Sequence, residues 1–264
     1  MTAQAQSSHK VHRYHELGRL DIIMSRSIET LLHISMTLLM LSSAIELAFI
    51  SSMVYWLTYE TVSFDVAYQD STVSMHGKPA KLLVNQGHTS NGAAGTAFIL
   101  IGLGGILALS LRHRAAKRGA TNSSPIIYII WLVLTILSML LTLAALIYTF
   151  LLTYQHAGQT IDVALAASLH NEPYPNFVAY PWYAWTPENW FTAMLELPLA
   201  HAGEYSDIRL HLAVMKGWRW NLIPMLVFGV AVTVFAFIDA MHHRRLAKDD
   251  RGSYELAEGK RLSA

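Results

Sequence analysis

Four long apolar runs dominate the pattern of hydrophobic and polar positions along this chain. None of them contains Lys or Arg. A membrane-spanning helix needs about 20 apolar residues to cross the hydrocarbon of a bilayer. The runs are continuous rather than alternating, which favours helices over the strands of a membrane barrel. The sequence therefore predicts an all-α membrane protein, a four-transmembrane-helix bundle, with spans at residues 31–57, 93–111, 125–154 and 222–241.

The polar segments around these spans predict the topology. Most of the 19 Lys and Arg residues lie in the N-terminal segment 1–30, in the short loop after the second span and in the tail 242–264. Positively charged loops stay in the cytoplasm, so both termini are expected there. The four-span membrane domain 31–241 then has outer loops at 58–92 and 155–221, and we expect it in the plasma membrane or the secretory pathway.

The first outer loop has the alternation of a β-strand. Val62, Phe64, Val66 and Tyr68 alternate with smaller or polar residues, which is a period-two pattern. A weaker apolar patch follows at residues 82–84. The pattern predicts a small β-hairpin, and because two strands alone are marginally stable, the hairpin should rest on the other loop or pair with a partner.

The second outer loop is rich in Pro and aromatic residues and has two expected short helices. Thr186 followed by Pro187 is a helix start, which predicts a helix over 187–197. A second helix is expected from Ser206 to about Gly217. The indoles of this loop either form a membrane-interface belt or a packed loop core, or they bind a ligand or partner. These indoles are Trp182, Trp185 and Trp190.

Small and weakly polar residues recur at helical spacing in three of the spans. Such faces let helix backbones approach closely in lipid. They predict packing within a four-helix bundle, with a homodimer face as the alternative. In the third span these residues are Thr135, Ser138, Thr142, Ala145 and Thr149.

Glu46 is the candidate catalytic residue because it is a carboxyl group within a span. Intramembrane carboxyls usually face the bundle interior and are functional candidates. The alternative is a neutral Glu46 that hydrogen-bonds Ser or Thr of another span. Asp239, in the last turn of the fourth span, is expected to reach the interface and to pair there near His242 and Arg244.

The residue types and motifs that the sequence lacks restrict the chemistry. The chain has no Cys, which excludes disulfides, thiol catalysis and cysteine-zinc sites. Neither HExxH nor a comparable metal motif is present, and there is no P-loop or GxSxG. We therefore expect no metal and no cofactor. The basic flanks are ordinary for cytoplasmic segments near a lipid surface and do not predict nucleic-acid binding.

Two short motifs carry a resemblance to known proteins. The segments 185–190 (WTPENW) and 253–256 (SYEL) resemble four-span membrane proteins of filamentous fungi. The topology is also similar to the claudin-like and tetraspanin classes, although the cysteine motifs of both are missing. This resemblance implies a membrane protein but no particular activity.

The sequence thus leaves three functional hypotheses. The leading one is a non-enzymatic scaffold or accessory subunit that acts through its outer loops on a protein partner or on a second copy. A small membrane-embedded enzyme for a lipophilic substrate is the first alternative, with Glu46 as acid or base. An oligomeric channel or transporter is the second.

Overall fold

Four helices of this chain are long and apolar enough to cross a membrane. The computed structural model describes residues 2–117, 126–175 and 184–262. Within them the four candidate spans are Met24–Glu60, Asn85–Ala115, Ile126–Gln155 and Ala202–Arg245. The prediction of four apolar helices is confirmed, and the chain is a membrane-embedded protein.

The helices extend beyond the apolar runs, since a helix need not end where its apolar stretch does. Two of these helices contain a π-helical segment, in which backbone hydrogen bonds join residues five apart instead of four. The long elements are α1 (Thr2–Tyr55) with η1 (Trp56–Glu60), α2 (Asn85–Thr96) with η2 (Ala97–Leu103) and α3 (Gly104–Lys117), α4 (Ile126–Gln155) and α7 (Ala202–Leu262).

The expected end of a short helix at Gly217 is wrong, because α7 continues through this residue without interruption. An interior glycine costs a helix only about 1 kcal/mol. Here it has a packing role: a Cβ at Gly217 would lie 3.2 Å from Cε2 of Phe49 in α1. The absent side chain therefore lets α7 approach an aromatic ring, and the segment after Ser206 belongs to the fourth long helix.

The chain divides into two compact units, and each of the four long helices contributes to both. The first unit contains residues 1–39, 99–137 and 228–264. Within it, Trp131 of α4 donates from Nε1 to the carbonyl oxygen of Ile101 at 3.1 Å. The indole of Trp131 also packs beside Gly105, where a Cβ would come within 2.8 Å of it. The absent side chain of Gly105 thus lets the Trp131 ring of α4 pack closely against α3.

The second unit contains residues 40–98 and 138–227, including both non-spanning segments. Strands β1 (Ser63–Tyr68) and β2 (Ser71–His76) form an antiparallel hairpin. Its turn residues Gln69 and Asp70 have φ of 45° and 61°, as in the type I′ turn that suits the twist of two-residue hairpins. The hairpin was predicted, but its second strand is β2 rather than the patch at 82–84, because the tight turn brings β2 back directly.

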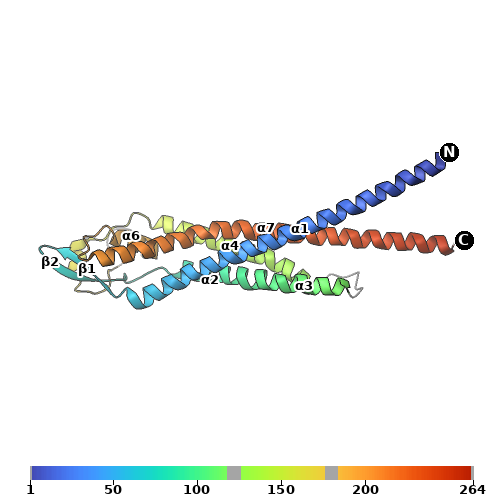
Figure 1. The fold of residues 1–264 in the computed structure, drawn as a ribbon. Helices are drawn as coiled ribbons and strands as arrows, with labels where there is room; N and C mark the ends of the chain where they lie inside the picture. The colour runs from blue at the N-terminus through green and yellow to red at the C-terminus, as the bar shows by residue number, and fades with distance from the viewer. Residues whose placement is uncertain (1, 118–125, 176–183, 263–264) are drawn as a thin grey trace. The chain divides into compact units, whose positions relative to one another are not determined.

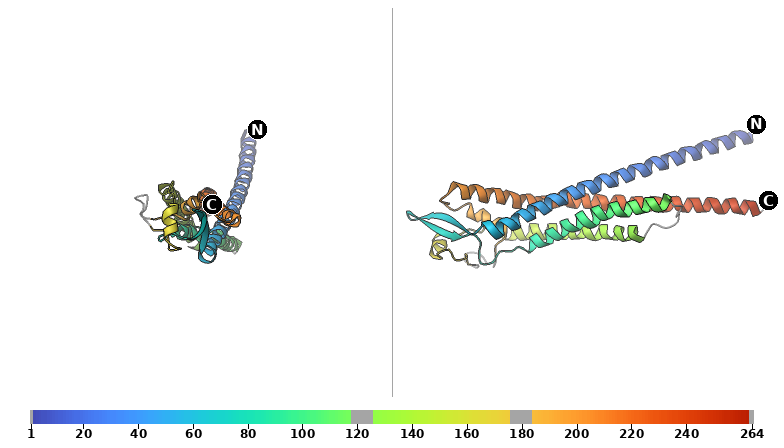
Figure 2. Two further views of the ribbon diagram at one scale, coloured as in Figure 1. Left: turned by 90° about the vertical axis from the view of Figure 1, so that its left-hand side faces the viewer. Right: turned by 60° about the horizontal axis from the view of Figure 1, so that its bottom comes forward.

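The hairpin rests on the second interhelical segment. Val66 bridges to Leu199, and the backbone N–H of Ala67 donates to the carbonyl oxygen of Pro198 at 2.8 Å. The N–H of Ala200 donates in turn to Asp65 at 2.7 Å. Figures 1 and 2 show the hairpin beside α6 (Pro187–Met194) and the first turns of α7. The expectation that the strands lean on the other loop is confirmed.

A single apolar core holds these segments together, and we call it the loop core. It joins the ends of α1 and α7 to the hairpin, to α5 (Val163–Ser168) and to α6. Its aromatic members are Trp56, Phe64, Tyr174, Trp185, Trp190 and Phe191.

Candidate functional site

Glu46 lies on α1 and is completely buried. Asn221 of α7 donates from Nδ2 to Glu46 Oε2 at 2.8 Å and to the carbonyl oxygen of Ser42 at 2.9 Å. The second carboxyl oxygen, Oε1, has no hydrogen-bond partner among the described residues. The expectation of a hydrogen bond to another helix is met by an asparagine rather than by Ser or Thr. Sequence reasoning missed Asn221 because it lies one residue before the fourth apolar run.

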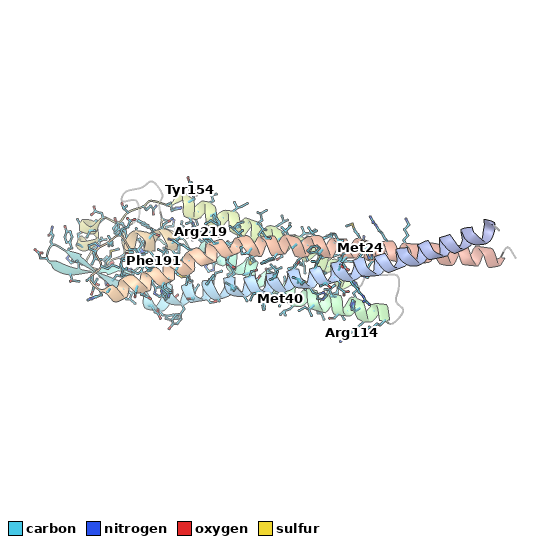
Figure 3. All side chains as sticks on the ribbon, turned by 45° about the horizontal axis from the view of Figure 1, so that its top comes forward. Met24, Met40, Arg114, Tyr154, Phe191 and Arg219 are labelled. Atoms are coloured by element: carbon cyan, nitrogen blue, oxygen red, sulfur yellow. The ribbon has the colours of Figure 1, made fainter. Side chains whose placement is uncertain are left out.

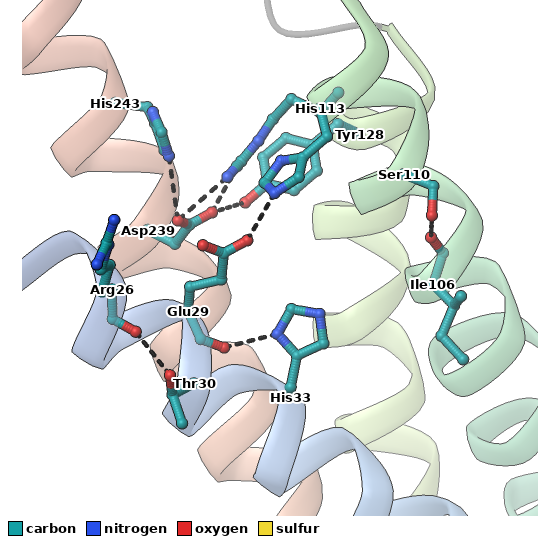
Figure 4. Close-up of polar contacts among 11 residues, drawn as sticks. Arg26, Glu29, Thr30, His33, Ile106, Ser110, His113, Tyr128, Asp239 and His243 are labelled. Atoms are coloured by element: carbon teal, nitrogen blue, oxygen red, sulfur yellow. Dashed lines mark hydrogen bonds and ion pairs between the residues drawn. The ribbon is translucent and has the colours of Figure 1, made fainter. Parts of the chain in front are cut away.

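Asp239 occupies a buried ion-pair cluster in the first unit, shown in Figure 4. Both terminal nitrogens of Arg112 donate to its carboxylate, with Nη2 to Oδ1 at 3.2 Å. The Tyr128 hydroxyl donates to Oδ2 at 2.7 Å, and His243 Nε2 lies 3.4 Å from Oδ1. Asp239 therefore contacts His243 of its own helix, near the expected neighbours His242 and Arg244, and also pairs with Arg112 of α3 and Tyr128 of α4, which were not expected. The sequence feature that could have indicated this pairing is Arg112, a positive charge directly after the second apolar run.

The Tyr128 hydroxyl also lies 3.2 Å from the carbonyl oxygen of Ala236 in α7, which it can bond as well. The guanidinium of Arg112 also lies over the Tyr128 ring, 4.5 Å from its centroid. A buried Arg–Asp pair with satisfied hydrogen bonds mainly fixes how helices pair. We therefore assign the cluster a structural role. The nearby contact between His113 Nε2 and Glu29 Oε1, at 3.0 Å, is largely exposed and adds little to stability.

Trp185 and Trp190 lie in the loop core, where Trp190 has no exposed surface. Their ring centroids are 5.1 Å apart and nearly perpendicular, an arrangement that aromatic pairs favour. Trp190 Nε1 donates to the carbonyl oxygen of Gly77 at 2.9 Å. The structure thus places these two indoles in a packed interior rather than on an open surface. Trp182, the third candidate, lies outside the described residues.

The loop core is attached to the helices by directed polar contacts as well as by packing. Trp56 Nε1 donates to Asp207 Oδ2 at 2.9 Å, and its ring stacks on His211 at 4.1 Å between centroids. The Phe191 ring is tilted against Trp56, with 4.6 Å between the ring centroids, and lies close to the hairpin in Figure 3. These contacts fix the hairpin and α6 to the ends of α1 and α7.

Glu188, in the first turn of α6, forms an ion pair with Arg219 of α7 at 3.1 Å. Burial nevertheless raises the pKa of the Glu188 carboxyl above its ordinary value, and the charges of Arg219 and Lys216 only partly oppose this shift. Burial likewise raises the pKa of Tyr174, whose hydroxyl accepts a hydrogen bond from the N–H of Asp162 at 3.1 Å. Both groups lie in the folded loops and hold them in place.

The second unit also contains a cavity of about 530 Å³ between the end of α1, the start of α2 and α7. This volume lies in the range of small-molecule sites. Its described lining includes no Asp, Glu, Lys or Arg, and Glu46 is not part of it. The lining residues are Ile50, Ser51, Met53, Val54, Tyr55, Leu57, Tyr59, Val84, Gln86, Gly87, His88, Asn91, Pro187, Met215 and Trp218.

Comparisons with known proteins add no assignment. No protein-family model, no curated protein and no solved structure matches this chain. The resemblance to fungal four-span proteins therefore stays an expectation. Within the described residues, no group of three His, Asp or Glu side chains lies close enough together to hold a metal ion.

Proposed function

We propose that this chain is a four-span scaffold or accessory subunit that holds a protein partner through its loops. The helices would form one bundle in the plasma membrane or a membrane of the secretory pathway. Both termini would be cytoplasmic, and the loop core would lie on the opposite side. The distribution of Lys and Arg supports this orientation, since basic segments stay cytoplasmic.

The observation that carries the proposal is the fixed shape of the two loops. They contain no disulfide, yet they share one apolar core, and hydrogen bonds join Trp56 to Asp207 and Trp190 to Gly77. A surface that is ordered before binding loses less conformational entropy when a partner docks. Loops that only connected helices would not need this degree of internal packing.

The free edge of β2 is the most suitable contact for the backbone of a partner. In the hairpin register, Thr72 and Ser74 oppose Ala67 and Asp65, the positions whose β1 backbone groups bond away from β2. The backbone groups of Thr72 and Ser74 therefore point to the open edge. No strand pairs with this edge in the described part of the chain. Such edges accept an added strand from another protein.

Affinity purification of the full-length protein from its native membrane tests the proposal. We expect a stable protein partner that is lost in Ser74→Pro. Proline removes an N–H that faces the open edge and is tolerated at such positions. The matched control is Ser71→Thr, which keeps every backbone donor of the same strand and should retain the partner.

Two outcomes would overturn the proposal. One is a monodisperse lone protein from native membranes that turns over a lipophilic substrate. The other is a partner that is retained equally by the wild type and by Ser74→Pro when both are folded. The enzyme alternative gains no support from the cavity, because no carboxylate is among its described lining residues. Nothing in the described geometry favours the channel alternative.

A further inference from the structure

We propose that β2 pairs with β2 of a second copy in a facing membrane, so that the chain joins two membranes by a homotypic contact. This contact rests on the proposed function, because it uses the same open edge and the same orientation, and it adds the identity of the partner. Three features of the hairpin support it: an edge without protection, a self-complementary register and the direction of the strands.

The fold covers one edge of the hairpin and leaves the other open. The edge of β1 is covered by residues 198–204, which bond to the backbone of Asp65 and Ala67. On β2, Thr72 and Ser74 are exposed, and no strand pairs with their side of the hairpin in the described part of the chain. The chain therefore shields β1 from other proteins but not β2.

The strand β2 also lacks the devices with which natural edge strands prevent pairing. Its sequence, STVSMH, contains no Lys, Arg, Asp, Glu or Pro. Each of its residues has a partner in β1, so β2 contains no bulge that would twist the edge away. An edge without charge, Pro or bulge is a template for another strand. We therefore infer that β2 is an interface.

A second copy of β2 matches this edge in antiparallel orientation. Alternate residues present their backbone groups to the open edge, and these residues are Thr72, Ser74 and His76. When Ser74 lies on the two-fold axis, it faces Ser74 of the second copy, and Thr72 faces His76 of the second copy. The outward donors of all three residues then meet acceptors. Such an isologous contact uses the same surface on both copies.

The charges at the two ends of β2 suit this register. Asp70, in the turn before β2, is exposed, and Lys78 follows the end of β2 by two residues. Antiparallel pairing about Ser74 brings the turn of one copy to the end of β2 in the other, so Asp70 and Lys78 occupy opposite positions. Opposite charges across a strand pair favour pairing, whereas like charges oppose it. The charge distribution therefore favours a second copy in this register.

The direction of the strands decides which copies are able to pair. Within the second unit, the hairpin continues past the end of α1 and the start of α7 in roughly the direction of these helices (Figures 1 and 2). The two-fold axis of an antiparallel strand pair is perpendicular to the strands and therefore also to the spans. Two copies in one membrane are related by an axis along the membrane normal, which does not give this pairing. A copy in a facing membrane is inverted, as the pairing requires.

Many such contacts would act together. One pair of short strands is a weak contact on its own. Two facing membranes carry many copies, and simultaneous contacts raise the avidity without any new surface. The homotypic pair would thus hold two membranes close together while each single contact stays reversible.

Phosphatidylcholine vesicles that contain only the purified full-length protein test this pairing. One population carries the protein with one affinity tag, and a second population carries it with another tag. We expect the two populations to cluster. Ser74→Pro should need at least about tenfold more protein for the same clustering, because each copy loses the N–H on the two-fold axis. Ser71→Thr keeps all backbone donors and should cluster as the wild type does.

Single-cysteine variants test the register, since the chain has no Cys of its own. In the proposed pair, the Cα atoms of residue 74 in the two copies are about 5.5 Å apart, which is within the range of a disulfide. Oxidation of Ser74→Cys with copper phenanthroline should therefore join chains that carry different tags. Ser71→Cys is the matched control. This position is exposed on the same strand, but its two copies lie about 20 Å apart along the pair and should not cross-link.

The results separate homotypic pairing from the proposed function. Homotypic pairing is overturned if Ser74→Cys and Ser71→Cys cross-link equally, or if Ser74→Pro, when folded, clusters vesicles as the wild type does. Disulfides that form only between chains with the same tag also overturn it, because the copies then pair within one membrane. If pure vesicles do not cluster while native membranes yield a different protein that Ser74→Pro loses, homotypic pairing fails and the proposed function stands.

Discussion

Removing one member of the buried Arg112–Asp239 pair should destabilise the protein far more than removing both. In Asp239→Leu, Arg112 keeps its charge, because a guanidinium does not deprotonate in proteins. Two N–H groups of Arg112 then lose their acceptor, and the Tyr128 hydroxyl keeps only the carbonyl oxygen of Ala236. A buried charge left without its partner typically costs about 3–5 kcal/mol.

The opposite single variant should be milder. In Arg112→Met, Asp239 keeps the Tyr128 hydroxyl as a donor, and a carboxyl group is able to take up a proton when its cation is lost. In the double variant Arg112→Met/Asp239→Leu neither charge remains, and stability should return to within about 1–2 kcal/mol of the wild type. The two substitutions are thus expected to be strongly non-additive.

The assay is thermal unfolding of the four proteins in one detergent at fixed pH. A loss of about 3–5 kcal/mol corresponds to a fall in Tm of roughly 10 °C for a chain of this size. Arg114→Met, an exposed Arg on the same helix, serves as the control and should shift Tm little. If the effects of the two single substitutions simply add in the double variant, the assigned structural role of the pair is refuted.

Three further predictions concern single sites. Glu46→Gln should change stability by less than about 1 kcal/mol, because an amide oxygen still accepts from Asn221. Asn221→Ala should cost about 1–3 kcal/mol, because it leaves buried acceptors unpaired. Equal shifts in Tm for the two variants would contradict this prediction. Gly105→Ala should cost about 1–3 kcal/mol, since its Cβ would lie 2.8 Å from Cζ2 of the rigid Trp131 indole, while Gly95→Ala has open space and serves as its control in the same unfolding assay. Burial raises the pKa of Glu188, so above the ordinary pKa of 4.5 the folded protein binds more protons than the unfolded chain. Its free energy of unfolding should therefore fall with rising pH relative to Glu188→Gln. A constant difference in Tm between pH 4.5 and 7 would refute this prediction.

Sequence and structure agree best where a property depends on a continuous stretch of chain. The spans follow from apolar length, and the start of α6 follows from Thr186, whose side chain accepts from the N–H of Asn189 as an N-cap. The hairpin was recognised from the alternation in β1, but β2 was missed because its residues are mostly polar and half of them are exposed. Its identity depends on the tight turn at Gln69 and Asp70 and not on its own pattern.

Long-range partners were beyond the reach of the sequence pattern. Asn221 and Arg112 lie directly beside the predicted apolar runs, and both bond to carboxyl groups more than 100 residues away in the chain. A polar residue at the end of a span is equally compatible with solvent, with lipid head groups and with a buried partner. Only the rotation of each helix about its axis decides among these, and that rotation is set by packing.

The sequence by itself therefore determined that this is a membrane-embedded protein with four apolar helices, because transfer of a continuous apolar run into lipid is a local property of that run. The tertiary structure decided the rest: that two loops without cysteine share a core, that Glu46 meets Asn221, and that α1, α2 and α7 leave a cavity between them. Each of these depends on side chains that are distant in sequence and adjacent only after the helices have packed.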